Sequence, residues 1–141
     1  MNEKMKLENQ LCFPLYACAK EVVRRYTPLL EPLGLTYTQY IAMMVMWEHK
    51  SISVRDMGKM LFLDSGTLTP MLKKMEKAGW ISRRRSREDE RMVIVTITEK
   101  GEKLQEQAAD VPVRMAGCLT LKNDDAMQLY SLLNELMKTF K

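Results

Sequence analysis

The densest chemical pattern in this sequence is a run of cations in its middle. Between Thr67 and Arg87 there are seven lysines and arginines and one acidic residue, Glu76, so the segment carries seven minus one, or +6, against +4 for the whole chain. A local excess of one sign is expected of a surface that binds phosphates. An ordinary solvated face is the alternative, but such a face normally mixes both signs. The charge pattern therefore favours nucleic acid as the partner.

The first of these cations lie on a predicted helix over residues 65–77. Asp64 and Ser65 can cap its start, and Gly79 can supply the left-handed residue that ends it. At about 3.6 residues per turn, three apolar residues share the side that would pack on a core: Leu68, Leu72 and Met75. The opposite side is polar and then cationic, and we expect it to contact DNA through Ser65, Thr67, Thr69, Pro70, Lys73, Lys74 and Lys77. Such a helix suits a major groove, with hydroxyls near base edges or phosphates and lysines on phosphates.

Pro70 is unusual inside this predicted helix. It removes a hydrogen bond to the carbonyl of Gly66, which lies on the same outward side. Because the position is near the second turn, a local bend there is tolerable.

A β-hairpin is predicted directly after the helix. Residues 80–83 and 92–97 are rich in β-forming side chains, and the polar residues 86–90 between them indicate its turn. Arg84 and Arg85 are expected to contact DNA. We expect Asp89 to pair with a nearby arginine and Arg91 to extend into the minor groove, where a narrow A·T-rich stretch favours arginine. The alternative is an ordinary exposed ion pair, which contributes little.

Three cysteines, at positions 12, 18 and 118, form the second candidate site. They have neither an even count nor metal-ligand spacing, so we expect reduced thiols and no metal or cofactor. Cys12 and Tyr16 are four apart and share a helix face, so a phenol could donate to the sulfur. If the helix begins near Pro14, Cys12 lies at its N-terminal end, where the helix dipole favours the thiolate. The alternative is a buried, inert Cys12.

Helices must position both sites. Apolar periodicity predicts a first helix from Leu7 to Tyr26, stopped by Pro28. A capping box of Thr36 and Gln39 predicts a second helix over 38–48, whose core face would hold Ile41, Met44, Val45 and Trp47. Further helices are predicted after a cap at Ser53, from about Glu99 after a cap at Thr98 and with a kink allowed near Pro112, and over residues 124–140.

Composition limits the class of protein. The chain has 141 residues, of which 46% are hydrophobic and 28% charged, as in one soluble globular domain. No apolar run is long enough to span a bilayer, and residues 1–4 lack the pattern of a signal peptide. We therefore expect a cytoplasmic protein with no membrane partner.

The segment Leu63–Glu76, followed by Arg83–Ser86 and Asp89–Arg91, resembles the recognition helix and wing of MarR-family regulators. The resemblance implies a mainly α fold with a small β-hairpin wing, in a single domain over 1–141. Residues 36–98 would form the winged helix-turn-helix core, and residues 7–27 and 99–141 the dimerisation helices. It also implies a homodimer that binds a pseudo-palindromic operator in double-stranded DNA.

The segments Leu7–Phe13, Leu15–Tyr16 and Leu35–Tyr37, together with Tyr26, resemble the organic-hydroperoxide-sensing, OhrR-like branch of that family. There a cysteine near the start of the first helix is the peroxide sensor, and two tyrosines hold its thiolate. Those roles would fall on Cys12, Tyr16 and Tyr26. Tyr26 is about 21 Å from its own Cys12 along a straight helix, so contact would need an antiparallel partner chain.

The resemblance leaves the fate of oxidised Cys12 open. Cys118 could be the resolving cysteine of a two-cysteine subclass, although it lies one position from the expected site, or a small cellular thiol could cap Cys12. We expect a repressor, not an enzyme, that senses organic hydroperoxides through Cys12 and then releases its operator. The alternatives are a MarR-type repressor that answers a small phenolic ligand without cysteine chemistry, and a thiol-dependent peroxidase, which would leave the cationic helix unexplained.

Overall fold

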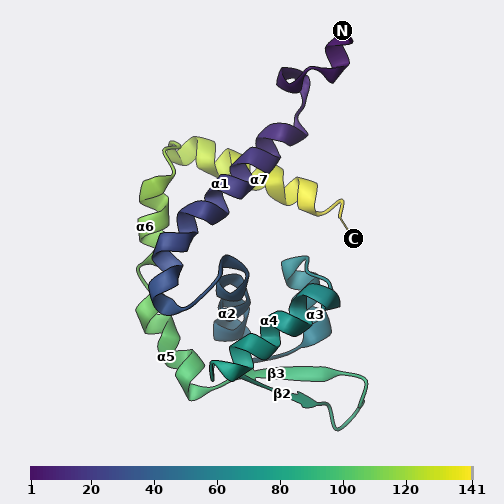
Figure 1. Cartoon of the computed structure of the whole chain (residues 1–141), viewed down its shortest axis with the longest axis vertical. Coiled ribbons are helices and arrows are strands. Elements are labelled where there is room, and N and C mark those ends of the chain that lie inside the picture. Colours follow the sequence, from purple (N-terminus) through teal and green to yellow (C-terminus); the bar gives the residue numbers. More distant parts are fainter. Residues whose placement is uncertain (141) are drawn as a thin grey trace. The chain divides into compact units, whose positions relative to one another are not determined.

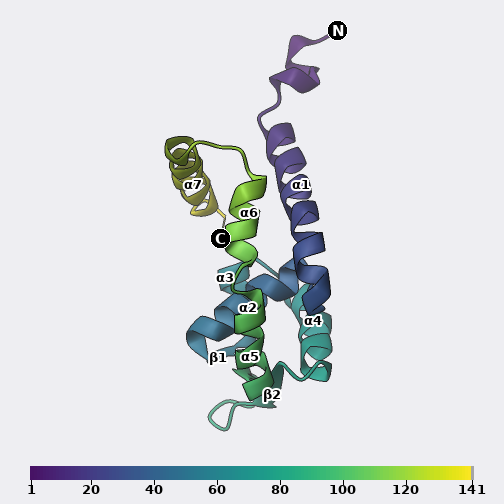
Figure 2. The same ribbon diagram turned by 90° about the vertical axis from the view of Figure 1, so that its left-hand side faces the viewer.

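The computed structural model describes residues 1–140. The chain divides into two compact units, Met1–Val111 and Pro112–Lys141. The predicted DNA-binding core lies entirely within the first unit (Figures 1 and 2). In the described residues, no helix has both the length and the apolar character needed to cross a bilayer.

The first long helix, α1, spans Cys12–Leu30 and begins later than predicted. Residues that were expected to start it form two 3₁₀ turns instead: η1 (Glu3–Met5) and η2 (Leu7–Asn9). The Gln10 side chain donates to the carbonyls of Lys4 and Lys6 at 2.7 and 2.8 Å. These bonds satisfy backbone acceptors in a non-helical arrangement, so the helix starts only after Gln10.

Both prolines of α1 are compatible with the helix. Pro14 is its third residue, where a backbone N–H would have no intrahelical partner anyway. Pro28 does not stop the helix as predicted, because it lies in the last turn and its missing N–H leaves only the Arg24 carbonyl without a donor. The chain then forms η3 (Glu31–Leu33) and turns at Gly34, whose φ is 76°.

Three helices and a hairpin follow, and a further helix leaves the hairpin (Figure 1). The elements are α2 (Tyr37–His49), β1 (Ser51–Ser53), α3 (Val54–Leu61), α4 (Ser65–Lys77), β2 (Ile81–Arg85), β3 (Val93–Ile97) and α5 (Glu99–Ala108). The strands form one antiparallel sheet in the order β1-β3-β2. The predicted fold class, a mainly helical winged helix-turn-helix, is confirmed.

Local capping determines where these helices begin. Four N-cap side chains accept a hydrogen bond from the backbone N–H three residues further on: Thr36, Ser53, Asp64 and Thr98. At Thr36 the Gln39 side chain accepts from the cap's own N–H, which completes the predicted capping box. Gly79, with φ 88°, follows α4 in the left-handed region that glycine adopts without a Cβ clash. These predictions are confirmed.

Leucines and methionines make up most of the core of the first unit. Fully buried side chains from α2, α3, α4 and the sheet include Met43, Met46, Met57, Leu68, Leu72, Met75, Ile81 and Val95. The predicted core face of α2 is partly wrong. Val45 is buried, but Met44 is 39% exposed. Ile41 and Trp47 are only half-buried. The helix packs against α1, α3, α5 and the sheet, so a wide surface of it is covered, including Tyr40.

The expected long helix from Glu99 is broken into two. Helix α5 ends at Ala108, and α6 (Val111–Cys118) begins with Pro112 in its first turn. The second unit continues into α7 (Asn123–Met137), which buries none of its residues. Large apolar side chains are instead exposed along it: Met127, Leu129, Tyr130, Leu132, Leu136 and Met137.

Candidate nucleic-acid interface and thiol site

Helix α4 presents a polar, cationic surface to solvent. Its opposite side is buried through Leu68, Met71, Leu72 and Met75. The helix starts at Asp64, whose Oδ1 accepts a hydrogen bond from the Thr67 N–H at 2.8 Å. The predicted DNA-contacting residues of this helix are all exposed: Ser65, Thr67, Thr69, Pro70, Lys73, Lys74 and Lys77. The two sides of the helix therefore divide as its wheel predicts.

Two arginines of the basic segment bond within the protein: Arg83 pairs with Glu76, and Arg85 Nη1 donates to the Glu90 carbonyl at 2.8 Å. Arg83 Nη2 lies 3.1 Å from Glu76 Oε1, and the Arg83 backbone N–H donates to Glu76 Oε2 at 2.9 Å. The backbone hydrogen bond, then the guanidinium, lowers the pKa of Glu76. This pair joins strand β2 to the last turn of α4. The neighbouring Arg84 and Arg85, both predicted DNA contacts, remain exposed.

The wing is the loop between β2 and β3, at the end of the hairpin in Figure 1. The structure places Asp89 against Arg91: Oδ1 accepts from the arginine Nε at 3.2 Å and from its backbone N–H at 3.1 Å. The side-chain bond, then the backbone bond, lowers the pKa of Asp89. The Arg91 side chain is nevertheless 90% exposed. Arg91 Nη2 also donates to Asp89 Oδ2 at 3.5 Å, so the carboxylate orients the guanidinium while most of the side chain stays open to solvent.

Hydrogen bonds join the end of α4 to the start of α5. Thr98 Oγ1 donates to the Gly79 carbonyl at 2.5 Å, and Lys100 Nζ donates to the Ala78 carbonyl at 2.7 Å. The Trp47 indole Nε1–H donates to the Gly101 carbonyl at 2.9 Å, which connects α2 to the same turn. A side chain at Gly101 would overlap the Trp80 carbonyl oxygen. Helix α4 is thus held by its neighbours at its C-terminal end.

Cys12 is the first residue of α1, and its thiol is exposed. The predicted position at the helix N-terminus is confirmed, and the alternative of a buried Cys12 is wrong for the single chain. Tyr16, one turn further on, is 64% exposed. Within residues 1–140 no hydrogen bond joins its hydroxyl to the Cys12 sulfur, so that predicted contact is not made in the single chain.

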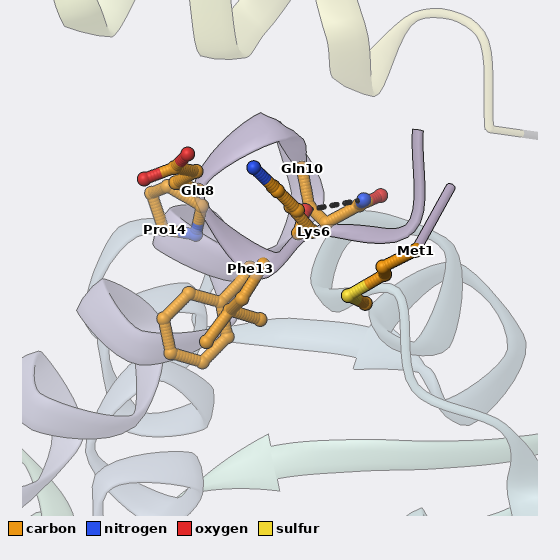
Figure 3. Close-up of a pocket in the computed structure, with 7 residues that line it drawn as sticks. Met1, Lys6, Glu8, Gln10, Phe13 and Pro14 are labelled. Atoms are coloured by element: carbon orange, nitrogen blue, oxygen red, sulfur yellow. Dashed lines mark hydrogen bonds between the residues drawn. The ribbon is translucent and has the colours of Figure 1, made fainter. Parts of the chain in front are cut away.

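A shallow pocket lies between the N-terminal turns and the start of α1. Phe13 and Pro14, which follow Cys12, line it together with the N-terminal turns, and its volume is about 660 Å³. Figure 3 shows Gln10 hydrogen-bonded to the Lys6 backbone at its edge. The pocket lining is mostly apolar, and Cys12 itself is not among the lining residues.

Tyr26 lies near the other end of α1 in an aromatic cluster. Its ring centroid is 4.8 Å from that of Tyr37 and 5.7 Å from that of Tyr40, and Tyr40 in turn meets Trp47 at 6.4 Å. Burial, and then the neighbouring Tyr37, raises the pKa of Tyr26, and burial raises the pKa of Tyr40 to about 12. Because α1 is one continuous helix, Tyr26 cannot reach Cys12 of its own chain.

The other two thiols are also exposed. Cys18 lies within α1, and Cys118 is the last residue of α6, in the second unit. None of the three cysteines is paired with another in a disulfide in the described part of the chain.

Known proteins with this sequence pattern are transcriptional regulators. The family model described as transcriptional regulator SarA/Rot matches residues 24–108. The organic hydroperoxide resistance transcriptional regulator of Bacillus subtilis strain 168 is 50% identical over 137 residues, which cover 97% of this chain and 93% of that protein. The chain belongs to the SarA/Rot family of transcriptional regulators.

Solved structures of similar regulators support the same assignment. Reduced AbfR of Staphylococcus epidermidis, solved bound to DNA, has a TM-score of 0.83 at 34% identity and covers 98% of this chain and 94% of its own. A cysteine-to-serine mutant of E. coli MarR, complexed with operator DNA, has a TM-score of 0.78 at 25% identity, covering 89% and 92%. The resemblance to MarR-type regulators of the organic-hydroperoxide-sensing branch is confirmed.

Several contacts that hold the site in place could not be predicted from the sequence. The Glu76–Arg83 pair and the Trp47–Gly101 bond join residues far apart in the sequence or of unremarkable type, so no local signal announces them. For Tyr37 the only signal was its place in a stretch that resembles the family. The aromatic cluster emerges only when α1 packs on α2, so the spacing of its residues in the sequence does not reveal it.

Proposed function

We propose that this regulator is a homodimeric repressor that binds duplex DNA when reduced and releases it when an organic hydroperoxide oxidises Cys12. The observation that carries the proposal is the exposed thiol at the first residue of α1, in a chain whose α4 and wing present cations outward. The relatives support it, because one is an organic hydroperoxide resistance regulator and AbfR has been solved reduced on DNA and with a disulfide formed.

The DNA contacts divide between two grooves. Helix α4 enters the major groove by its N-terminal end, so that Ser65, Thr67 and Thr69 approach base edges or phosphates. The lysines further along neutralise phosphates and set the register. Arg91, supported by Asp89, inserts into the adjacent minor groove. Phosphate contacts of this kind make the affinity fall steeply with salt.

A dimer completes the thiol site. Tyr26 lies fourteen residues from Cys12 on the same straight helix, about 21 Å away, so the Tyr26 phenol reaches a Cys12 thiol only from an antiparallel partner chain. The exposed apolar side chains of α7 supply a surface that a second copy would cover. Two α4 helices, about one helical turn of DNA apart, would then match a pseudo-palindromic operator.

The chemistry proceeds in two steps. The Cys12 thiolate attacks one peroxide oxygen, so that an S–O bond forms, the O–O bond breaks, and the organic alcohol leaves with a proton. The sulfenic acid then condenses with a second thiol, either Cys118 or a small cellular thiol, to give a disulfide and water. The new group at Cys12 shifts the dimer helices and alters the spacing of the two α4 helices, which releases the operator.

The test titrates DNA binding against cumene hydroperoxide. Reduced protein is mixed with a fluorescent duplex selected by the wild type from a random library, and anisotropy is followed for wild type, Cys12→Ser and Cys18→Ser. Cys18 is the matched control, because it is an exposed thiol on the same helix. We expect wild type and Cys18→Ser to release DNA and Cys12→Ser to stay bound. Equal release by all three would remove the redox claim, and release by a phenol alone would favour the small-ligand repressor.

A further inference from the structure

We infer that Gly66 and Pro70 form the base-reading surface of α4 and that this surface selects an A·T pair in the major groove. The inference rests on the proposed function, in which α4 enters that groove. Both residues are exposed and lie one helical turn apart on the outward side of the helix. The same side carries the hydroxyls and lysines already assigned to DNA.

Nothing in the folded protein requires a glycine at position 66. Its backbone is helical and has no left-handed φ, unlike Gly34 and Gly79. A Cβ there would meet nothing nearer than Asp64 Oδ1 at 3.4 Å, an ordinary contact, whereas at Gly58 and Gly101 it would overlap backbone atoms. Alanine is the better helix former, so glycine at this position destabilises the helix slightly, and no contact within the folded protein requires it. Close approach of another molecule's surface is what such a glycine permits.

Pro70, one helical turn after Gly66, also destabilises the helix locally. It is the sixth residue of α4 and exposed, so its ring fills no core space. Because proline has no N–H, the Gly66 carbonyl lacks its usual donor, and the ring pushes that carbonyl away from the helix axis. The Gly66 carbonyl thus lacks the usual donor four residues on, is not covered by a side chain of its own residue, and lies beside an apolar ring.

This pair of groups matches one edge of DNA. In the major groove adenine offers its N6 amine as a donor, and its partner thymine offers a methyl group. The Gly66 carbonyl can accept from the amine while the Pro70 ring packs on the methyl. A G·C pair has no methyl, and its guanine presents the O6 acceptor where adenine has the N6 donor. Its one major-groove donor, the cytosine N4 amine, lies on the pyrimidine, so the amine and methyl contacts cannot both be made. Departures from local sequence rules of this kind are expected at functional sites.

The test removes single groups from the DNA. In the duplex selected by the wild type, deoxyuridine replaces thymine to delete the methyl, and purine deoxynucleoside replaces adenine to delete the amine, one position at a time. We expect one position in each half-site where both replacements weaken wild-type binding by about five-fold or more. In Pro70→Ala, which restores the N–H and removes the ring, both effects at that position should fall below about two-fold. Pro70→Val should keep the methyl effect and lose the amine effect.

The control variant is Lys73→Ala, which should weaken every duplex by the same factor and leave the pattern of positions unchanged. An unchanged pattern in Pro70→Ala would overturn the inference while leaving the proposed function intact. Uniform weakening by Gly66→Ala and Pro70→Ala would also overturn it, since these residues would then face phosphates. A wild type that prefers no duplex would overturn the proposed function together with the inference.

Discussion

Two carboxylates hold Arg83 and Arg91 in different ways. Glu76 accepts from both the backbone and the guanidinium of Arg83, which is therefore a structural residue. Asp89 accepts from the backbone N–H, Nε and Nη2 of Arg91, yet the Arg91 side chain remains largely exposed. The same type of pair thus has two uses, and burial distinguishes them: the Arg83 side chain is 22% exposed and the Arg91 side chain 90%.

Glu76→Gln should lower the free energy of unfolding by about 0.5 kcal/mol near neutral pH, since the lost charge is partly screened by solvent. The pKa of Glu76 is lower in the folded protein than its ordinary value of 4.5. The pair's contribution is therefore fully present above pH 4.5 and is lost as the pH falls through the lowered value. Denaturant unfolding of wild type and variant at several pH values should show a constant difference down to about pH 5 that shrinks below it. A difference that grows in acid would contradict this account.

Asp89→Ala should weaken DNA binding about two- to five-fold, because it removes the support but not the cation of the wing. Arg91→Ala should weaken binding more, by about ten-fold, with the larger loss on duplexes with A·T-rich flanks. In the double variant the Asp89 effect should vanish, which a double-mutant cycle of dissociation constants measures. Additive losses from the two changes would mean that Asp89 acts independently of Arg91.

At the scale of elements, α4 is held at both ends by different means. Its start depends on one local cap, Asp64, whereas its end is bonded to α5 through Thr98 and Lys100. Trp47 extends this network to α2 and, through Tyr40, to Tyr26 on α1. A displacement of α1 therefore has a packed route to the DNA-facing helix within the first unit. Gly101, in the first turn of α5, is the residue through which Trp47 joins this network.

Gly101→Ala should destabilise the protein by about 3 kcal/mol, because a Cβ at this position would overlap the Trp80 carbonyl and press on Ile97. Gly117→Ala is the matched control: nothing lies within 4 Å of its added Cβ, and alanine is the better helix former. Thermal unfolding of both variants should show a lower Tm for the first and an equal or higher Tm for the second. Equal Tm values would mean that the α5 turn is not tightly packed.

The elements that the sequence predicts well are those with local causes. The cap residues Thr36, Ser53 and Thr98 each bond to a backbone N–H three residues further on. Because both partners are close in the sequence, these helix starts can be predicted from it. Strand β1 is only three residues long and is formed by pairing with β3. Because β3 lies about forty residues further along the chain, no local sequence pattern predicts this pairing. The start of α1 was misplaced because Gln10 bonds to backbone carbonyls that a helix would otherwise use. At the site, residue types predicted the cations and the thiol, but their partners came from packing.

At the scale of the whole molecule, α7 carries an exposed apolar stripe. Leu129, Leu132 and Leu136 recur at helical spacing along it and are all exposed. Exposed contiguous apolar surface on this scale marks a protein contact. A second copy is the partner that would also bring a Tyr26 phenol to Cys12. Dimerisation and redox sensing are therefore linked in this account.

Leu132→Asp should shift the protein from dimer to monomer, because a charge would be buried in the contact. Lys138→Asp, on the same segment but exposed and charged in the wild type, is the control. Sedimentation velocity at micromolar concentration measures both. The monomer should also lose most of its affinity for a duplex with two half-sites. A dimeric Leu132→Asp protein would show that α7 contributes no such contact.

The most direct test of the account follows one sample through oxidation and reduction. The wild-type protein, bound to its selected fluorescent duplex, is treated with one equivalent of cumene hydroperoxide and then with excess dithiothreitol, while anisotropy is recorded and Cys12 is assayed by mass spectrometry. The account predicts loss of binding in step with oxidation of Cys12, and recovery when the thiol is restored. Undiminished binding by protein that is fully oxidised at Cys12 would contradict it.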